Sequence, residues 1–135
     1  MSKKKKVAIL FGGRSVEHGV SINSARNIVE FIDKKKYIPI PIGISKSGKW
    51  FLASGVDKNI QKGAPLSLVL DAQKPGFINL STGKRFSVDA IFPVLHGTDG
   101  EDGSIQGLIK AMDIPMVGTG VLGSSMSMNK VVAKR

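Results

Sequence analysis

The residues best suited to chemistry lie in FGGRSVEHGV, residues 11–20, between a short apolar run and a helical pattern. Two glycines, an arginine, Glu17 and His18 share this single connection. A carboxylate near the start of a helix is stabilised by the helix dipole. The same carboxylate could instead hold a substrate ammonium group at the mouth of a pocket. The residue pattern alone leaves both interpretations of Glu17 open.

Motif spacing excludes several kinds of site in this connection. The next glycine after Gly12 and Gly13 is Gly19, so the G-x-G-x-x-G of a dinucleotide-binding loop is absent. The Walker pattern GxxxxGK[ST] is absent as well. His18 has no histidine four residues later, because that position is Ile22, and this excludes an HExxH zinc motif. We therefore expect His18 to be a surface residue.

A second polar stretch, HGTDGEDG at residues 96–103, follows a predicted buried strand. It does not fit the calcium loop D-x-[DN]-x-[DN]-G, because Gly103 stands four residues after Asp99. We expect Asp102 to cap the next helix. His96 begins the glycine-rich bend, where a structural role and a ligand contact are equally compatible with its position.

A third stretch, GTGVLGSSMSMNK at residues 118–130, is rich in small residues. Its serines lack the G-x-S-x-G pattern of a nucleophile elbow, so capping or packing is the favoured role. Lys130 could contact a phosphate group.

The sequence has no cysteine, which excludes disulfides, thiolate metal sites and a cysteine nucleophile.

These three stretches are separated by strand and helix patterns. Strands are predicted at residues 7–11, 37–44, 50–52, 66–70, 77–80, 85–88, 90–95 and 114–117, and helices at 17–33, 103–113 and from about 121. The prolines in residues 37–44 predict a strand near a sheet edge, and residues 53–76 are otherwise predicted to be irregular.

The order of these elements predicts an α/β fold with a mostly parallel sheet and small added hairpins. Ligands of such sheets bind beyond the carboxyl ends of the strands. Loops 12–18, 96–102 and 118–124 fit that position.

Length and charge narrow the class of protein. A chain of 135 residues fits one domain. The formal net charge is +10, but the lysine runs flank predicted elements and no aromatic residue interleaves them, so we expect solvated charge and no nucleic-acid partner. The apolar run at residues 7–11 is too short for a secretory or membrane segment, and a cytoplasmic protein without a membrane partner is expected.

Two extended segments together carry a family resemblance. VAILFGGRSVEHGVSINSA resembles the opening of D-alanine–D-alanine ligases, and FPVLHGTDGEDGSIQGLIKAMDIPMVGTGVLGSSMSMNK resembles their second motif, HGxxGEDGxxQG with IPYVG and S-A-x-x-M-D-K. The resemblance implies that residues 1–135 form a Rossmann-like, three-layer pre-ATP-grasp domain that binds substrate. The central and C-terminal ATP-grasp domains are absent from this chain, so we expect no turnover by the chain alone.

The resemblance also implies an activity for the full-length protein. ATP phosphorylates the carboxylate of one D-alanine, the amine of a second attacks the acyl phosphate, and the dipeptide serves peptidoglycan synthesis. ATP and Mg²⁺ (or Mn²⁺) would be the cofactors of the full-length enzyme, with none expected on this chain. A D-Ala-D-Lac or D-Ala-D-Ser ligase domain, or a non-catalytic module that binds nucleotide or nucleic acid, remains the alternative.

Site residues are implied position by position. Glu17 matches the glutamate that binds the ammonium of the first D-alanine, and His96 matches the histidine near the substrate carboxylate; both are the candidate catalytic residues. Ser15 and Val16 match the substrate-binding loop, and Lys130 matches a lysine on the ATP side. We expect no metal ligand in this chain. The implied partners are D-alanine, the ATP-grasp domains and a second copy in a homodimer.

Overall fold

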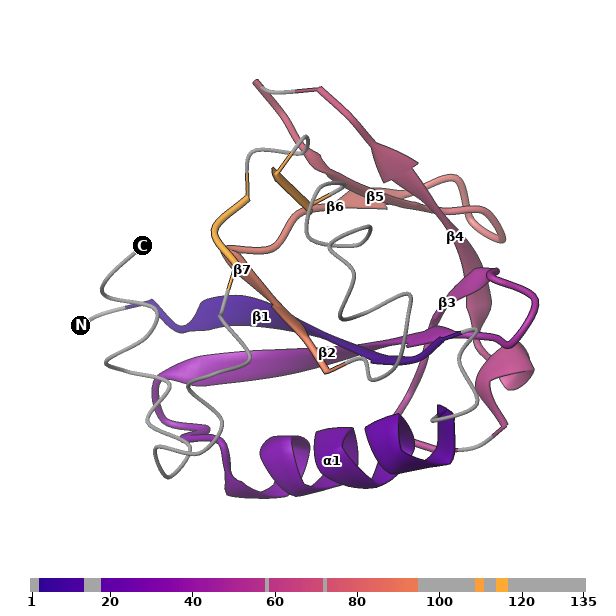
Figure 1. Ribbon diagram of the computed structural model, residues 1–135. Helices are drawn as coiled ribbons and strands as arrows, with labels where there is room; N and C mark the ends of the chain where they lie inside the picture. The colour runs from indigo at the N-terminus through magenta and orange to yellow at the C-terminus, as the bar shows by residue number, and fades with distance from the viewer. Residues whose placement is uncertain are drawn as a thin grey trace.

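One mixed sheet organises the part of the chain that the computed structural model describes, which is residues 3–13, 18–57, 59–71, 73–94, 109–110 and 114–116. The strand order is β6-β5-β4-β3-β2-β1-β7 (Figure 1). The elements are β1 (Lys5–Gly12), α1 (His18–Phe31), β2 (Tyr37–Ile44), β3 (Trp50–Leu52), η1 (Ile60–Lys62), β4 (Ala64–Val69), β5 (Gly76–Asn79), β6 (Arg85–Phe86) and β7 (Ala90–Pro93).

Strand β1 is the centre of the fold. It pairs in parallel with β2 on one side and with β7 on the other. Its residues from Val7 to Phe11 are fully buried, as expected for a continuous apolar run in a parallel strand that is covered on both faces. We call β2, β1 and β7 the parallel trio.

Helix α1 covers one face of the parallel trio (Figure 1). Its buried residues Ile22, Ala25, Ile28 and Ile32 recur at helical spacing and pack in one cluster with Val7, Ile9 and Phe11. The predicted helix at residues 17–33 is confirmed with slightly shorter bounds.

The opposite face of the parallel trio carries a second cluster, which includes Ala8, Leu10, Ile91 and Ile109. Of the second predicted helix, residues 103–113, the structure describes only residues 109 and 110, and both are helical. The buried side chain of Ile109 therefore contributes to a layer on this second face.

The other half of the sheet, β3 to β6, is antiparallel, and we call it the antiparallel extension. The two hairpins expected from the predicted strands at 37–44 with 50–52 and at 77–80 with 85–88 are confirmed. Phe77 packs against Trp50 and Phe86 with ring centroids 6.5 and 5.3 Å apart. The α/β class is thus confirmed, but the sheet is mixed rather than mostly parallel. Within residues 53–76, β4 confirms the strand predicted at residues 66–70 but begins two residues earlier, and η1 was not predicted.

The prediction that β2 lies near a sheet edge is wrong, since β3 flanks it on the side away from β1. The carbonyl of Pro41 accepts a hydrogen bond from the Ala53 N–H at 3.0 Å, so the polar backbone atoms of Pro41 face β3. Pro39, two residues earlier, faces the same side, beyond the three residues that β3 pairs with. Neither proline therefore removes a hydrogen bond to β1.

The outer side of β7 also has a partner. Ile91 forms a parallel bridge with Met116, and the Ile91 N–H donates to the Pro115 carbonyl at 2.9 Å. This is the part of the predicted strand at residues 114–117 that the structure describes.

Candidate functional site

The carboxyl ends of the parallel trio meet at one edge of the sheet. Gly12, the last residue of β1, is paired with Ile44, the last of β2, and Leu10 is paired with Pro93, the last of β7. The chain leaves β1 for β2 on one side, whereas β7 lies on the other, so the strand order switches between β1 and β7. In α/β sheets this switch point opens the crevice in which ligands bind.

Two glycines turn the chain away from β1 at this edge. Gly12 and Gly13 have φ angles of 90° and 99°, a region that residues with a Cβ rarely adopt. The Gly13 N–H donates to the Ile44 carbonyl at 2.7 Å. The connection that carries Glu17 therefore starts from a backbone position fixed against β2.

A buried serine ties the same edge to α1. The Ser21 hydroxyl accepts a hydrogen bond from the Gly12 N–H at 2.8 Å and donates to the Val94 carbonyl. The Ser21 side chain is fully buried. The sequence analysis missed this residue, and the only available signal was a serine among buried apolar positions of α1.

The turn between β2 and β3 borders the site on its other side. The Ser45 N–H donates to the Lys49 carbonyl at 2.8 Å, and the buried Ser45 hydroxyl accepts from the Lys49 N–H at 3.1 Å. This turn carries the exposed residues Lys46 and Lys49. Positive charge is thus present beside the carboxyl end of β2.

The predicted site residues Ser15, Val16, Glu17, His96 and Lys130 all lie outside the described residues. What the structure does place is the backbone on which two of the connections begin. Glu17 immediately precedes α1, and His96 follows Val94 by two residues. Because Gly12 and Val94 share the Ser21 hydroxyl, the connections carrying Glu17 and His96 start from adjacent points.

The described residues contain no metal centre, since no group of three or more His, Cys, Asp or Glu side chains among them could hold an ion. No helix in the described ranges is long and apolar enough to cross a membrane.

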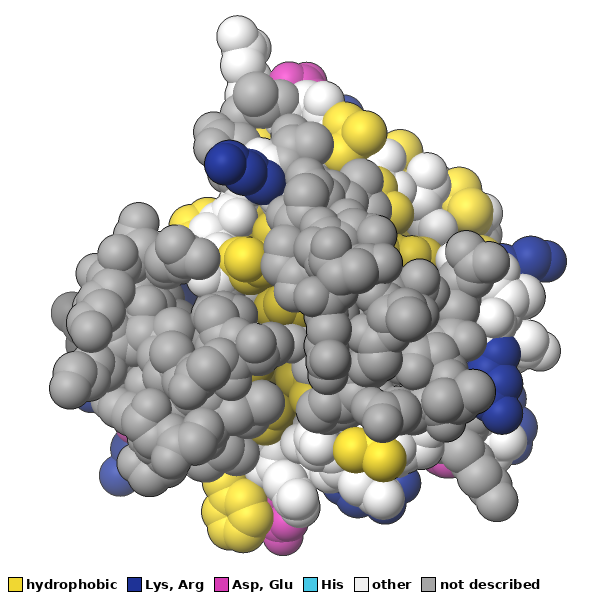
Figure 2. Space-filling model, in the orientation of Figure 1, with side chains coloured by type: hydrophobic (Ala, Val, Ile, Leu, Met, Phe, Trp, Pro, Cys, Tyr) yellow, Lys and Arg dark blue, Asp and Glu magenta, His cyan; other side chains and the backbone are white. Residues whose placement is uncertain are grey.

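Basic side chains do not gather into one patch on the face shown in Figure 2, where the described Lys and Arg residues lie at several separate places around the rim. The pKa of Tyr37 is raised by burial and, to a smaller extent, by the Asp33 carboxylate. Tyr37 begins β2 and so lies at the opposite end of the strand from the candidate site.

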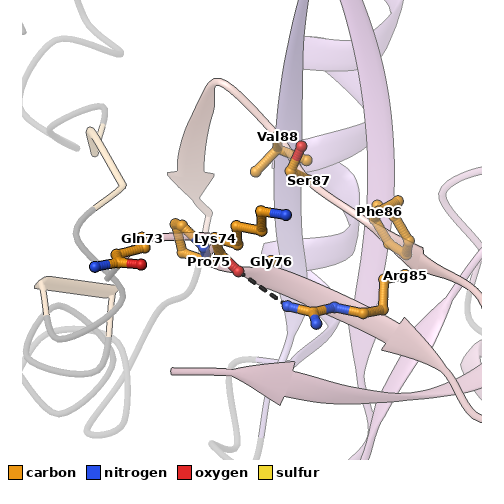
Figure 3. Close-up of a pocket in the computed structure, with 8 residues that line it drawn as sticks. All are labelled: Gln73, Lys74, Pro75, Gly76, Arg85, Phe86, Ser87 and Val88. Carbon is orange, nitrogen blue, oxygen red and sulfur yellow. Dashed lines mark hydrogen bonds between the residues drawn. The ribbon is translucent and has the colours of Figure 1, made fainter. Parts of the chain in front are cut away.

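A separate pocket of about 560 Å³ lies beside β5 and β6 (Figure 3). The Arg85 guanidinium in its wall donates to the Lys74 carbonyl at 3.1 Å. Its charged and polar side chains are exposed to solvent, and Val88 stands just before the amino end of β7. This pocket is therefore distinct from the edge formed by the carboxyl ends.

A family model described as "D-ala D-ala ligase N-terminus" matches residues 6–119. The D-alanine–D-alanine ligase of Thermoanaerobacter sp. (strain X514) is 43% identical over 98% of this chain and 39% of its own length. The chain thus spans about two fifths of the length of the curated relatives that it matches.

Two solved structures show the same fold. The D-alanine–D-alanine ligase from Coxiella burnetii matches with a TM-score of 0.78 and 36% identity, over 98% of this chain and 40% of that one. The VanG D-Ala:D-Ser ligase from Enterococcus faecalis matches with a TM-score of 0.77 and 37% identity, over 85% of this chain and 36% of that one.

Proposed function

The chain belongs to the D-alanine–D-alanine ligase N-terminal family, and on this basis we propose that it supplies the first D-alanine site of an ATP-dependent ligase. The observation that carries the proposal is the shared starting point of two connections. Gly12, before the Glu17 connection, and Val94, before the His96 connection, both bond to the Ser21 hydroxyl. A carboxylate and an imidazole brought to this edge would face the ammonium and the carboxylate of one amino acid.

In this proposal the chain binds and orients substrate. Glu17 holds the ammonium group of the first D-alanine, and Ser15 and Val16 shape the loop around it. His96 lies near the substrate carboxylate, which is the group that must be activated before an amine can attack it. Fixing both charged ends of so small a molecule lowers the entropic cost of reaction.

The nucleotide chemistry is assigned to the remaining length of the full protein. ATP with Mg²⁺ or Mn²⁺ would supply the phosphoryl group that activates the carboxylate, with Lys130 on the ATP side. We expect residues 1–135 alone to be inactive, because they span about 39% of the length of the D-alanine–D-alanine ligase that they match. The protein is expected to be cytoplasmic and to contribute to peptidoglycan synthesis.

The test is dipeptide formation by the complete gene product with ATP and D-alanine, measured by phosphate release and by mass spectrometry of the product. Glu17→Gln should lower kcat/KM for D-alanine at least about 100-fold, since a charge-assisted contact is lost. Glu30→Gln, an exposed change in α1, is the matched control. Absence of D-Ala-D-Ala from the wild-type reaction would refute the proposal.

A second candidate differs only at the second subsite. The similarity to the VanG D-Ala:D-Ser ligase, at 37% identity, makes D-serine an alternative nucleophile. Competition between equal concentrations of D-alanine, D-serine and D-lactate in the same assay would separate the three ligase activities. We expect D-Ala-D-Ala to be the main product, in keeping with the curated relatives.

We further propose a homodimer that forms through α1. Val20 and Phe31 are large apolar residues with 52% and 65% of their surface exposed. They stand eleven residues apart, which is close to three helical turns, and so share one side of the helix. Sedimentation that shows only monomer at high protein concentration would contradict this assembly.

A further inference from the structure

Ser21 interrupts the hydrogen bonding between β1 and β7 where the two strands end. The Val94 N–H donates directly to the Leu10 carbonyl at 2.8 Å. In a regular parallel pair, the next hydrogen bond would run from the Gly12 N–H to the Val94 carbonyl. Instead, the Ser21 hydroxyl lies between them, accepting from Gly12 at 2.8 Å and donating to Val94.

This insertion separates the two strands. A direct N–H···O=C bond places its nitrogen and oxygen about 2.9 Å apart, whereas a hydroxyl bridging the two atoms holds them farther apart. A serine hydroxyl suits this place because it can donate and accept at once. Ser21 is fully buried, so its hydroxyl, and not water, supplies the hydrogen-bond partner of the Gly12 N–H and of the Val94 carbonyl.

The separation occurs at the switch point of the sheet. Beyond Gly12 the chain continues toward Glu17, and beyond Val94 it continues toward His96. On the premise of the proposed function, we propose that Ser21 is a positioning residue that holds the ends of β1 and β7 apart at this switch point, and that the affinity of the proposed site for one small zwitterionic amino acid depends on this separation. Ser21 acts through the backbone and touches no reacting atom.

This role differs from that of an ordinary buried serine in what its removal does. In Ser21→Ala, the Gly12 N–H and the Val94 carbonyl can bond directly, so the two strands close together. The site then narrows while the backbone groups remain paired. If Ser21 had only a structural role, Ser21→Ala would lower the stability of the fold and leave the affinity for D-alanine unchanged.

The kinetic test compares variants of the complete gene product in the dipeptide assay. Ser21→Ala should raise the KM of the first D-alanine at least about 10-fold, with kcat and the KM of ATP within about 3-fold of wild type, because ground-state binding is what is lost. Ser21→Thr keeps the hydroxyl and should restore most of the affinity. Ser67→Ala, an exposed change in β4, is the matched control.

A structural measurement separates failure of this proposal from failure of the proposed function. Crystal structures of wild type and Ser21→Ala should show the Gly12 nitrogen and Val94 oxygen approaching to about 2.9 Å in the variant. An unchanged separation overturns the proposed role of Ser21, even if the wild-type protein forms no dipeptide. If the two atoms approach in Ser21→Ala but the KM of D-alanine is unaltered, then Ser21 does not position the substrate site.

Discussion

The parallel trio and the antiparallel extension belong to one sheet but differ in how their strands end. In the parallel trio, β2, β1 and β7 share one direction, so their carboxyl ends and the connections after them collect at a single edge. In the antiparallel extension, neighbouring strands run in opposite directions, and their turns alternate between the two edges. Direction alone therefore gives the first region a place to assemble a site, and leaves the second a packing role.

The largest expected effect comes from the centre of the parallel trio. Leu10 is fully buried in β1, whereas Leu80, after β5, is 58% exposed. Leu10→Ala should lower the free energy of unfolding by about 2–5 kcal/mol through lost burial and a cavity, and Leu80→Ala by less than about 0.5 kcal/mol. Urea unfolding followed by circular dichroism measures both, and equal losses would contradict the assigned core.

Gly76→Ala tests whether the antiparallel extension is independent of the site. An added Cβ would lie 2.3 Å from the Phe86 carbonyl oxygen, so the β5–β6 pairing must shift. We expect a loss of about 1–3 kcal/mol in unfolding free energy, without a change in kcat/KM for D-alanine.

Gly55→Ala is the matched control, because an added Cβ there meets nothing within 4 Å. If kcat/KM falls in Gly76→Ala at temperatures where the protein stays folded, then the two regions are coupled and the contrast between them fails.

Gly12→Ala tests the parallel trio, the region that carries the candidate site. Gly12 has a φ of 90°, and forcing a residue with a Cβ into that region costs about 1–3 kcal/mol. We expect a fall in thermal midpoint together with a lower affinity for D-alanine, because the connection toward Glu17 is re-aimed. Gly19→Ala, an open helical position in α1, should leave the midpoint unchanged or raise it.

The smallest expected effect concerns the amino end of β2. Burial and the Asp33 carboxylate raise the pKa of Tyr37, so the folded state binds this proton more tightly than the unfolded state. Its contribution to stability is full below the unfolded pKa of about 10 and is lost as the pH rises through the folded pKa.

Tyr37→Phe should flatten this alkaline decline and leave activity near neutral pH unaltered. Since Tyr37 is the only tyrosine among these 135 residues, the ultraviolet absorbance of tyrosinate in a chain of these residues reports its titration directly. A midpoint at or below the ordinary tyrosine value would contradict the burial of its hydroxyl.

Local patterns predicted most of the secondary structure. The apolar run of β1 and the helical spacing in α1 can each be recognised from a few neighbouring residues of sequence. The position of β2 inside the sheet was missed, because it depends on which side of the strand the nitrogens of Pro39 and Pro41 face. That side is set by pairing with β1 and β3 and not by composition.

The site was predicted unevenly for a similar reason. The glycines at the end of β1 and the meeting of the connections at the strand ends follow from general rules of α/β sheets. The role of Ser21 does not, since its acceptor Val94 stands 73 residues later in the chain. The positions of Glu17, His96 and Lys130 remain predictions.

The bridge between Ile91 and Met116 sets a limit on how this protein can be dissected. Without residues 114–116, the Ile91 N–H would lose its partner Pro115, and the outer edge of β7 would be bare. Bare strand edges recruit other chains. Expression fragments that end before residue 114 should therefore aggregate, whereas fragments that retain this segment keep the edge protected.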